Sequence, residues 1–244
     1  MFHKHYIFNW AKSYKKIRYF LGGVILNTNL KYKIVLENIV KRIKNNTILD
    51  NINLKLESGK IYGFTGRNGS GKTMLFRLIC GLILPNTGKV IIDNKEINTG
   101  NYIPQSIGAI IETPGFIDYY TGFKNLKILS SIKNIIDDKK ITDIMKLVGL
   151  DPNDNRKVKE YSLGMRQKLG IAQAIMEDPE IIILDEPMNS LDKESIKIVY
   201  NILISLKSKG CTILLASHIA EDINLLCDEV FHMDCGKLTK EITR

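Results

Sequence analysis

Residues 66–73 read Gly-Arg-Asn-Gly-Ser-Gly-Lys-Thr, a glycine-rich segment that ends in a lysine and a threonine. It fits the pattern G-x-x-x-x-G-K-[ST], in which glycines let successive backbone N–H groups converge on phosphate oxygens. The apolar residues 61–65 before it predict a strand, and residues 74–80 after it predict a helix, which is the context that this motif requires. The stretch therefore predicts a phosphate-binding loop within an α/β fold.

The loop also predicts what its own residues do. The N-terminus of the following helix adds the positive end of its dipole to the phosphate site. Lys72 is expected to reach the β- and γ-phosphates of a nucleotide, and the Thr73 hydroxyl is expected to hold Mg²⁺. The residues predicted to bind nucleotide here are Gly66, Arg67, Asn68, Gly69, Ser70, Gly71, Lys72 and Thr73.

A second segment predicts the other half of the site. Residues 181–184 are Ile-Ile-Ile-Leu, as expected of a strand buried on both faces, and Asp185 and Glu186 follow directly. A buried strand presents such groups to a ligand beyond its C-terminal end, where α/β sheets bind ligands. Asp185 suits a contact to Mg²⁺ through water, and Glu186 suits polarisation of an attacking water. The alternative is a solvated turn that holds two acids.

The remaining pattern alternates between strands and helices. Strands are predicted at residues 34–40, 52–56 and 211–216, and a hairpin is predicted around Asp93 and Asn94. Apolar residues at helical spacing predict helices within residues 123–149, after Ser162, and over residues 193–209. Gly149 is expected to cap the first of these helical regions.

Composition and charge exclude several classes of protein. With 244 residues, 44% of them hydrophobic and 25% charged, the chain is typical of one soluble globular domain. No apolar run approaches the ~18 residues that a membrane-spanning helix needs. The net charge is +9, but the first 33 residues contribute seven Lys and Arg and no Asp or Glu. The rest of the chain is nearly neutral, so a nucleic-acid-binding groove is not indicated.

Further motifs resemble those of one family. Residues 161–165 (Tyr-Ser-Leu-Gly-Met) fall where the ATP-binding subunits of ATP-binding cassette (ABC) transporters carry a signature, usually Leu-Ser-Gly-Gly-Gln. Residues 181–186 fall at the family's Walker B motif, residues 189–192 at its D-loop, and His218 at its switch histidine. From about residue 34 to residue 244 the chain therefore resembles such a subunit.

This resemblance implies a fold and an activity. The fold is a P-loop NTPase domain of the ABC type, with a RecA-like core sheet, an antiparallel β subdomain, and an α-helical subdomain at about residues 113–177. The activity is hydrolysis of ATP to ADP and phosphate, with Mg²⁺ as cofactor and with Lys72, Glu186 and His218 as catalytic residues. In a homodimer, Ser162 and Gly164 of one subunit would meet the γ-phosphate held by the other.

The same resemblance implies partners and a location. The expected partner is an integral membrane permease, and the subunit would lie peripherally on the cytoplasmic face of the membrane. No nucleic-acid partner is expected.

Three departures from the family's pattern narrow the interpretation. Glu112 stands where a glutamine is usual, and it is expected to touch the Mg²⁺ shell. The signature reads Ser-Leu-Gly-Met rather than Ser-Gly-Gly-Gln, and Ile43 falls near the position of the adenine-stacking aromatic residue. The first two departures resemble the bacitracin-efflux and lantibiotic-immunity ATPases, in which a separate permease exports an antimicrobial peptide or clears it from the membrane.

Other functions stay open as alternatives. One is a nucleotide-binding regulatory subunit without turnover. Another is an ABC ATPase outside transport, such as a chromosome-maintenance or translation-associated protein. Chromosome-maintenance ATPases carry long heptad insertions between the phosphate-binding loop and the signature, whereas only residues 74–160 intervene here. Translation-associated ATPases generally hold two cassettes in one chain, whereas this chain has one such loop.

The basic N-terminal extension, residues 1–33, has a pattern of its own. Apolar residues at spacings of three and four predict an amphipathic helix with basic residues on its other faces: Ile7, Trp10, Tyr14, Ile17 and Leu21. Such a helix would lie on an anionic membrane surface or dock on the permease. The alternatives are a disordered extension and a misassigned start codon.

Overall fold

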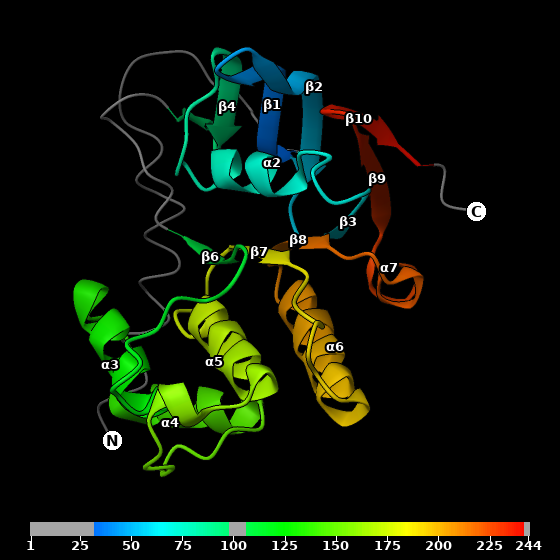
Figure 1. Cartoon of the computed structure of the whole chain (residues 1–244). Coiled ribbons are helices and arrows are strands. Elements are labelled where there is room, and N and C mark those ends of the chain that lie inside the picture. The colour runs from blue at the N-terminus through cyan, green and yellow to red at the C-terminus, as the bar shows by residue number, and fades with distance from the viewer. Residues whose placement is uncertain (1–31, 98–105, 242–244) are drawn as a thin grey trace, which may run out of the picture. The chain divides into compact units, whose positions relative to one another are not determined.

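The computed structural model describes residues 32–97 and 106–241 (Figure 1). The amphipathic helix predicted within the N-terminal extension lies outside the described residues. Among the described helices, none combines the length and the apolar character needed to cross a bilayer.

One sheet is antiparallel and has the strand order β2-β1-β4-β5. Its strands are β1 (Tyr32–Ile43), β2 (Asn46–Glu57), β4 (Thr87–Ile92) and β5 (Lys95–Glu96). Leu36 of β1 pairs with Leu54 of β2 and with Val90 of β4, so these three buried side chains share one face. Asp93 and Asn94 both have positive φ, as a two-residue type I′ hairpin requires, which confirms the predicted turn.

The second sheet has six strands in the order β10-β9-β3-β8-β7-β6. They are β3 (Ile61–Thr65), β6 (Ile107–Ile110), β7 (Ile181–Asp185), β8 (Thr212–Ala216), β9 (Glu229–Asp234) and β10 (Lys237–Lys240). Strands β6, β7, β8, β3 and β9 run parallel, and β10 is antiparallel to β9. The segments that follow β3, β6, β7 and β8 therefore begin at one edge of the sheet.

The helices pack on both faces of this sheet. They are α2 (Lys72–Ile79), α3 (Gly122–Lys133), α4 (Asp138–Leu147), the 3₁₀ helix η2 (Val158–Glu160), α5 (Leu163–Ile175), α6 (Lys193–Ser208) and α7 (Ala220–Leu226). In Figure 1, α2 lies between the antiparallel sheet and the six-stranded sheet, and α3, α4 and α5 lie together on the far side. The mixed α/β architecture confirms the predicted fold class.

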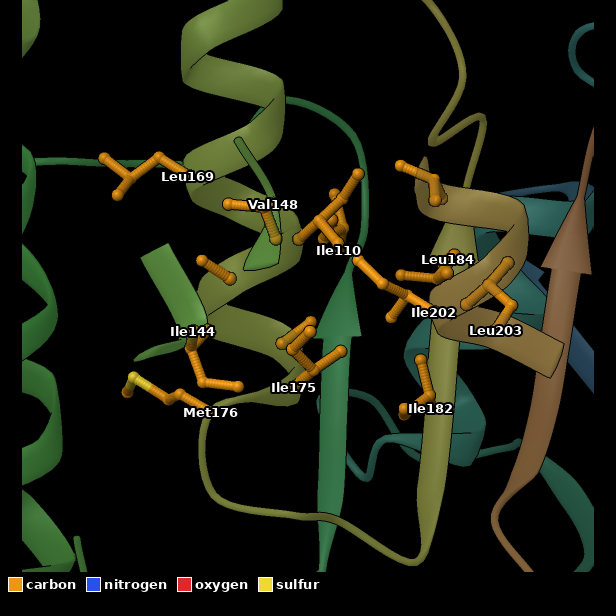
Figure 2. Close-up of a cluster of buried hydrophobic side chains, with 14 of the residues drawn as sticks. Ile110, Ile144, Val148, Leu169, Ile175, Met176, Ile182, Leu184, Ile202 and Leu203 are labelled. Atoms are coloured by element: carbon orange, nitrogen blue, oxygen red, sulfur yellow. The ribbon is translucent and has the colours of Figure 1, made fainter. Parts of the chain in front are cut away.

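The buried strand β7 explains why two cores form. Ile182 and Leu184 point into a core shared with α4, α5 and α6 (Figure 2). Ile181 and Ile183 point the other way, into a core shared with α2 and the antiparallel sheet. Because successive strand residues face opposite sides, a strand covered on both faces must be apolar throughout.

Side-chain oxygens cap four of the helices at their N-termini. Ser162 accepts a hydrogen bond from the backbone N–H of Met165, 3.2 Å away, and α5 begins at the next residue, as predicted. Thr121, Asp137 and Asp192 cap α3, α4 and α6 in the same way. Gly149, just after α4, has φ of +75°, in agreement with its predicted capping role.

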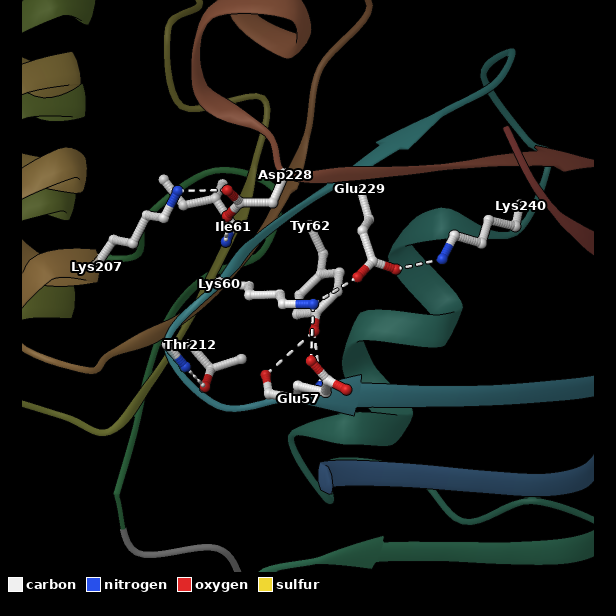
Figure 3. Close-up of polar contacts among 10 residues, drawn as sticks. Glu57, Lys60, Ile61, Tyr62, Lys207, Thr212, Asp228, Glu229 and Lys240 are labelled. Atoms are coloured by element: carbon white, nitrogen blue, oxygen red, sulfur yellow. Dashed lines mark hydrogen bonds and ion pairs between the residues drawn. The ribbon is translucent and has the colours of Figure 1, made fainter. Parts of the chain in front are cut away.

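A network of polar contacts stabilises the end of the six-stranded sheet that lies opposite the phosphate-binding loop (Figure 3). The Lys60 ammonium lies 2.7 Å from the carboxylate of Glu57 and 2.9 Å from that of Glu229, and Lys240 pairs with the other oxygen of Glu229 at 2.6 Å. The hydrogen bonds from these two lysines hold the pKa of Glu229 below its usual value. Asp228 accepts the backbone N–H of Ile61 at 2.8 Å. These contacts join the start of β9 to the start of β3.

Candidate functional site

The phosphate-binding loop connects β3 to α2 and needs glycine at specific positions. Gly66 has φ of +134°, and a Cβ there would lie 2.2 Å from the carbonyl oxygen of Met233 on β9. Gly71, at the N-cap of α2, has φ of +115°. L-residues with a Cβ rarely adopt either conformation, and at position 66 the space is also filled.

The β9–β10 hairpin braces this loop from outside the motif. The backbone N–H of Gly236 donates to the carbonyl of Ser70 at 3.0 Å. The Thr65 hydroxyl lies 3.0 Å from Nδ1 of His232 on β9. Neither strand of the hairpin was predicted, because the polar residues at the strand ends hide a short alternating pattern. The brace is therefore a part of the site that the local sequence pattern does not reveal.

Lys72 and Ser70 are residues of the loop whose polar side chains are buried. The Lys72 side chain is largely buried, and its ammonium donates to the carbonyl of Gly66 at 2.6 Å and to that of Arg67 at 3.2 Å. The Ser70 hydroxyl is buried and has no hydrogen-bond partner within the described residues. A buried hydroxyl normally has a partner, so this loop suits a phosphate oxygen as the missing acceptor.

Thr73 and Asp185 meet across the cleft, although 112 positions separate them in the chain. The Thr73 hydroxyl on α2 donates to Oδ2 of Asp185, at the end of β7, over 2.6 Å. Hydroxyl and carboxylate oxygens are hard ligands, and Mg²⁺ commonly takes one or two such groups together with substrate phosphates. The pair thus fits Mg²⁺. The described residues contain no dedicated group of three or more metal-binding side chains.

Glu186 and His218 lie at the ends of the neighbouring strands β7 and β8. Nδ1 of His218 is 2.7 Å from Oε2 of Glu186. The backbone N–H of Glu186 donates to the carbonyl of Ala216 at 3.0 Å, and Glu186 itself has φ of +54°. A non-glycine residue in this region is uncommon, and such strain gathers at functional sites.

A buried carboxylate anchors the segment that carries His218. Asp222 accepts a hydrogen bond from the Ser217 hydroxyl at 2.6 Å and another from the Tyr200 hydroxyl at 2.5 Å, and it is 1% exposed. Burial and this carboxylate together raise the pKa of Tyr200, so the phenol remains a donor. The network fixes the turn from which His218 projects.

The start of α5 rests on the loop that follows β7. A Cβ added to Gly164 would lie 2.7 Å from the carbonyl oxygen of Ser190. The Gln167 amide donates to the carbonyl of Pro187 at 3.0 Å, and Leu163, at the start of the same helix, is 72% exposed. The predicted signature and D-loop segments thus touch within one chain, and Leu163 is left facing outward.

One cleft of about 690 Å³ collects most of the predicted residues. The predicted residues that line it are Asn68, Gly69, Ser70, Gly71, Lys72, Thr73, Glu112, Asp185, Glu186, Asn189 and Ser190, and Ile48 and Arg77 are among its other lining residues. Gly66 and Arg67 precede these loop residues in the chain but are not among the lining residues, and His218 contacts the lining residue Glu186. Ser162 and Gly164 are not among its lining residues, although their neighbour Leu163 is. Ile43 also lies outside this lining and is 45% exposed.

Glu112 lies at this cleft with a partner that the sequence did not reveal. It follows β6 with φ of +62°, and its carboxylate forms an ion pair of 2.8 Å with the guanidinium of Arg77 on α2. Arg77 lies on α2 and Glu112 follows β6, so no pattern within a few residues could have revealed the pair.

Comparisons with known proteins agree with this geometry. Residues 49–189 match the family model described as ABC transporter. The chain is 46% identical over 201 residues to the uncharacterized ABC transporter ATP-binding protein YybJ of Bacillus subtilis, covering 82% of this chain and 92% of that protein. It is 37% identical to the bacitracin transport ATP-binding protein BcrA of Enterococcus faecalis, covering 87% and 70% of the two chains.

A further relative and a solved structure extend the comparison. The lantibiotic transport ATP-binding protein SrtF of Streptococcus pyogenes is 34% identical, with 84% of this chain and 89% of that protein covered. A dimeric ATP-binding cassette in a post-hydrolysis state, bound to ADP and Pi, superposes with a TM-score of 0.77 at 24% identity, covering 86% of this chain and 100% of that one. At that identity the superposition establishes the fold.

Proposed function

The chain belongs to the ABC transporter family as an ATP-binding subunit, and we propose that it hydrolyses ATP to drive export of an antimicrobial peptide or drug. The proposal assigns this activity to residues 34–244, in a homodimer on the cytoplasmic face of the membrane. A separate integral permease would carry the transported molecule. Relatives named for bacitracin and lantibiotic transport support the choice of cargo.

The contact between Glu186 and His218 is the observation that carries the proposal. A nucleotide-binding subunit without turnover needs the phosphate-binding loop but has no use for a carboxylate and an imidazole held 2.7 Å apart beside it. General acid–base catalysis needs such groups within hydrogen-bond reach of each other and of the reacting water. We therefore favour hydrolysis over a purely regulatory role.

Each residue then has a part in the reaction. Lys72 would contact the β- and γ-phosphates, and Thr73 and Asp185 would hold Mg²⁺, which when bound would offset phosphate charge. The Glu186 carboxylate would orient and polarise the attacking water, while His218 holds that carboxylate in place. Ser162 and Gly164 would meet the γ-phosphate bound by the second subunit. The outward-facing Leu163 supports such an interface.

Phosphate release by the subunit in vesicles that also contain its permease tests the proposal. We expect ATP-dependent release that the transported peptide stimulates, and that Lys72→Ala abolishes. Cells producing both proteins should tolerate more bacitracin or lantibiotic than cells producing the Lys72→Ala variant. Release without any change in tolerance would contradict the cargo. Absence of release by the intact complex would support the regulatory alternative.

A further inference from the structure

Helix α2 presents two hydrogen-bond donors to two neighbouring strands. Thr73 and Arg77 are four residues apart on α2 and so lie on the same face, one turn apart. Thr73 donates to Asp185 at the end of β7, and Arg77 pairs with Glu112 beyond the end of β6. Because β6 and β7 are adjacent and parallel, these two contacts form side by side at one edge of the sheet.

The charged residues around the cleft indicate a role for Arg77. Of the described residues that line it, Glu112, Asp185 and Glu186 carry carboxylates, while the proposed ligand is itself a polyanion. The Lys72 ammonium is turned toward loop carbonyls, and the Arg166 guanidinium pairs with Asp118 at 3.0 Å. Arg77 is therefore the cation that meets Glu112 at 2.8 Å.

We propose that Arg77 is a positioning residue for nucleotide binding, which neutralises the Glu112 carboxylate and holds it at the rim of the phosphate site. The chain thereby keeps a carboxylate near the Mg²⁺ position without repelling the triphosphate. This inference rests on the proposed function, since it takes ATP to be the ligand of the cleft. Arg77 acts through Glu112 and is not itself a catalytic residue.

The solvent exposure of the Arg77–Glu112 pair argues that the pair does not serve mainly to stabilise the fold. The side chains of Arg77 and Glu112 are 38% and 58% exposed, and exposed ion pairs add little to folding stability. Their removal should therefore leave the fold unchanged. A carboxylate that loses its cation beside a phosphate site, however, lowers affinity for the anion, and does so most at low salt.

Equilibrium titration with a fluorescent ATP analogue, in EDTA and in Mg²⁺, tests the inference on the full chain. We expect Arg77→Gln to weaken binding about tenfold in EDTA, which is about 1.4 kcal/mol, and about threefold in Mg²⁺, where the metal already offsets phosphate charge. Arg77→Lys, which keeps the charge, should stay within about threefold of wild type. Glu112→Gln should do the same, and the double variant Arg77→Gln/Glu112→Gln should recover to that range.

A matched variant controls for the loss of any exposed ion pair. Lys127 pairs with Asp138 at 2.6 Å, with side chains 55% and 58% exposed, and it does not line the cleft, so Lys127→Gln should change neither affinity nor melting temperature. Wild-type affinity in Arg77→Gln, or a double variant as weak as Arg77→Gln, would overturn the inference alone. A wild-type chain that binds no ATP analogue would overturn the proposed function and this inference with it.

Discussion

Nδ1 of His218 lies 2.7 Å from Oε2 of Glu186, so this side-chain contact links the ends of β8 and β7. The two residues are 32 positions apart in the chain, and α6 lies between them. The contact depends on the pairing of β7 with β8, which brings Asp185 opposite Ala216. A substitution that shifts either strand is therefore expected to displace the Glu186 carboxylate, which is proposed to activate water.

Glu186→Gln should retain ATP binding and abolish turnover. The amide keeps the shape of the side chain but loses the charge that polarises water. We expect phosphate release to fall at least about a hundredfold, and ATP to trap a stable homodimer on size-exclusion chromatography. Glu194→Gln on α6, at an 82% exposed side chain, is the matched control and should behave as wild type. Turnover by Glu186→Gln at the wild-type rate would remove Glu186 from its proposed role.

Glu112→Gln should change the Mg²⁺ dependence and the coupling to transport more than the affinity for ATP. A carboxylate is a hard ligand with a full charge that the amide lacks. We expect the Mg²⁺ concentration for half-maximal phosphate release to rise severalfold, measured with the permease present. Glu96→Gln, in the antiparallel sheet, serves as the control. An unaltered Mg²⁺ titration together with unaltered transport would count against a role for Glu112.

Because residue 43 is an isoleucine, we expect the protein to discriminate only weakly between ATP and GTP. Stacking of a base on an aromatic ring contributes about 1–3 kcal/mol, and an isoleucine side chain offers no ring. ATP and GTP should therefore bind within about tenfold of each other, and Ile43→Tyr should tighten ATP binding about tenfold. Ile204→Tyr on α6, similarly exposed at 50%, should have no effect. Strong ATP selectivity in the wild type would mean that another aromatic ring does the stacking.

Tyr200→Phe should destabilise the fold by removing one of the two hydroxyl donors to Asp222. Loss of one hydrogen bond to a buried carboxylate lowers the free energy of unfolding by about 1–3 kcal/mol. We expect that drop in the free energy of unfolding, measured by urea denaturation. Tyr119→Phe, at a residue that is 70% exposed, should leave the stability unchanged. Equal stability of Tyr200→Phe and wild type would show that Ser217 alone satisfies the carboxylate.

Deletion of residues 1–30 should leave ATPase activity in solution unchanged, since no predicted catalytic residue lies there. If the segment binds membranes, the truncated chain should sediment less with anionic vesicles. Added salt should then lower sedimentation of the full-length chain, because each basic residue near such a surface contributes at most about 1 kcal/mol through a screened attraction. Equal sedimentation of both forms would contradict a membrane role.

Local signals predicted the fold more completely than the site. The glycines at 66 and 71, the apolar run of β7 and the cap at Ser162 each lie within a few residues of what they determine, so the sequence displays them. The partner of Glu112 could not be predicted in this way, because Arg77 belongs to an element far away in the chain. The contacts of His232 and Gly236 with Thr65 and Ser70 were missed as well, because the β9–β10 hairpin that carries them was not predicted. The apolar residues that predict helices within residues 123–149 are not all buried: Ile132 is 77% exposed, because α3 ends at Lys133 and the separate helix α4 follows.

The contact between the β9–β10 hairpin and the phosphate-binding loop has a consequence for the order of biosynthesis. Thr65 and His232 touch although 167 positions separate them. A ribosome completes the motif at residues 66–73 long before it makes the strands that hold the motif in shape, and such distant pairings form late in folding. A nascent chain should therefore bind nucleotide only after β9 and β10 have emerged from the ribosome. Stalled fragments that end before β9 should not compete for cellular ATP.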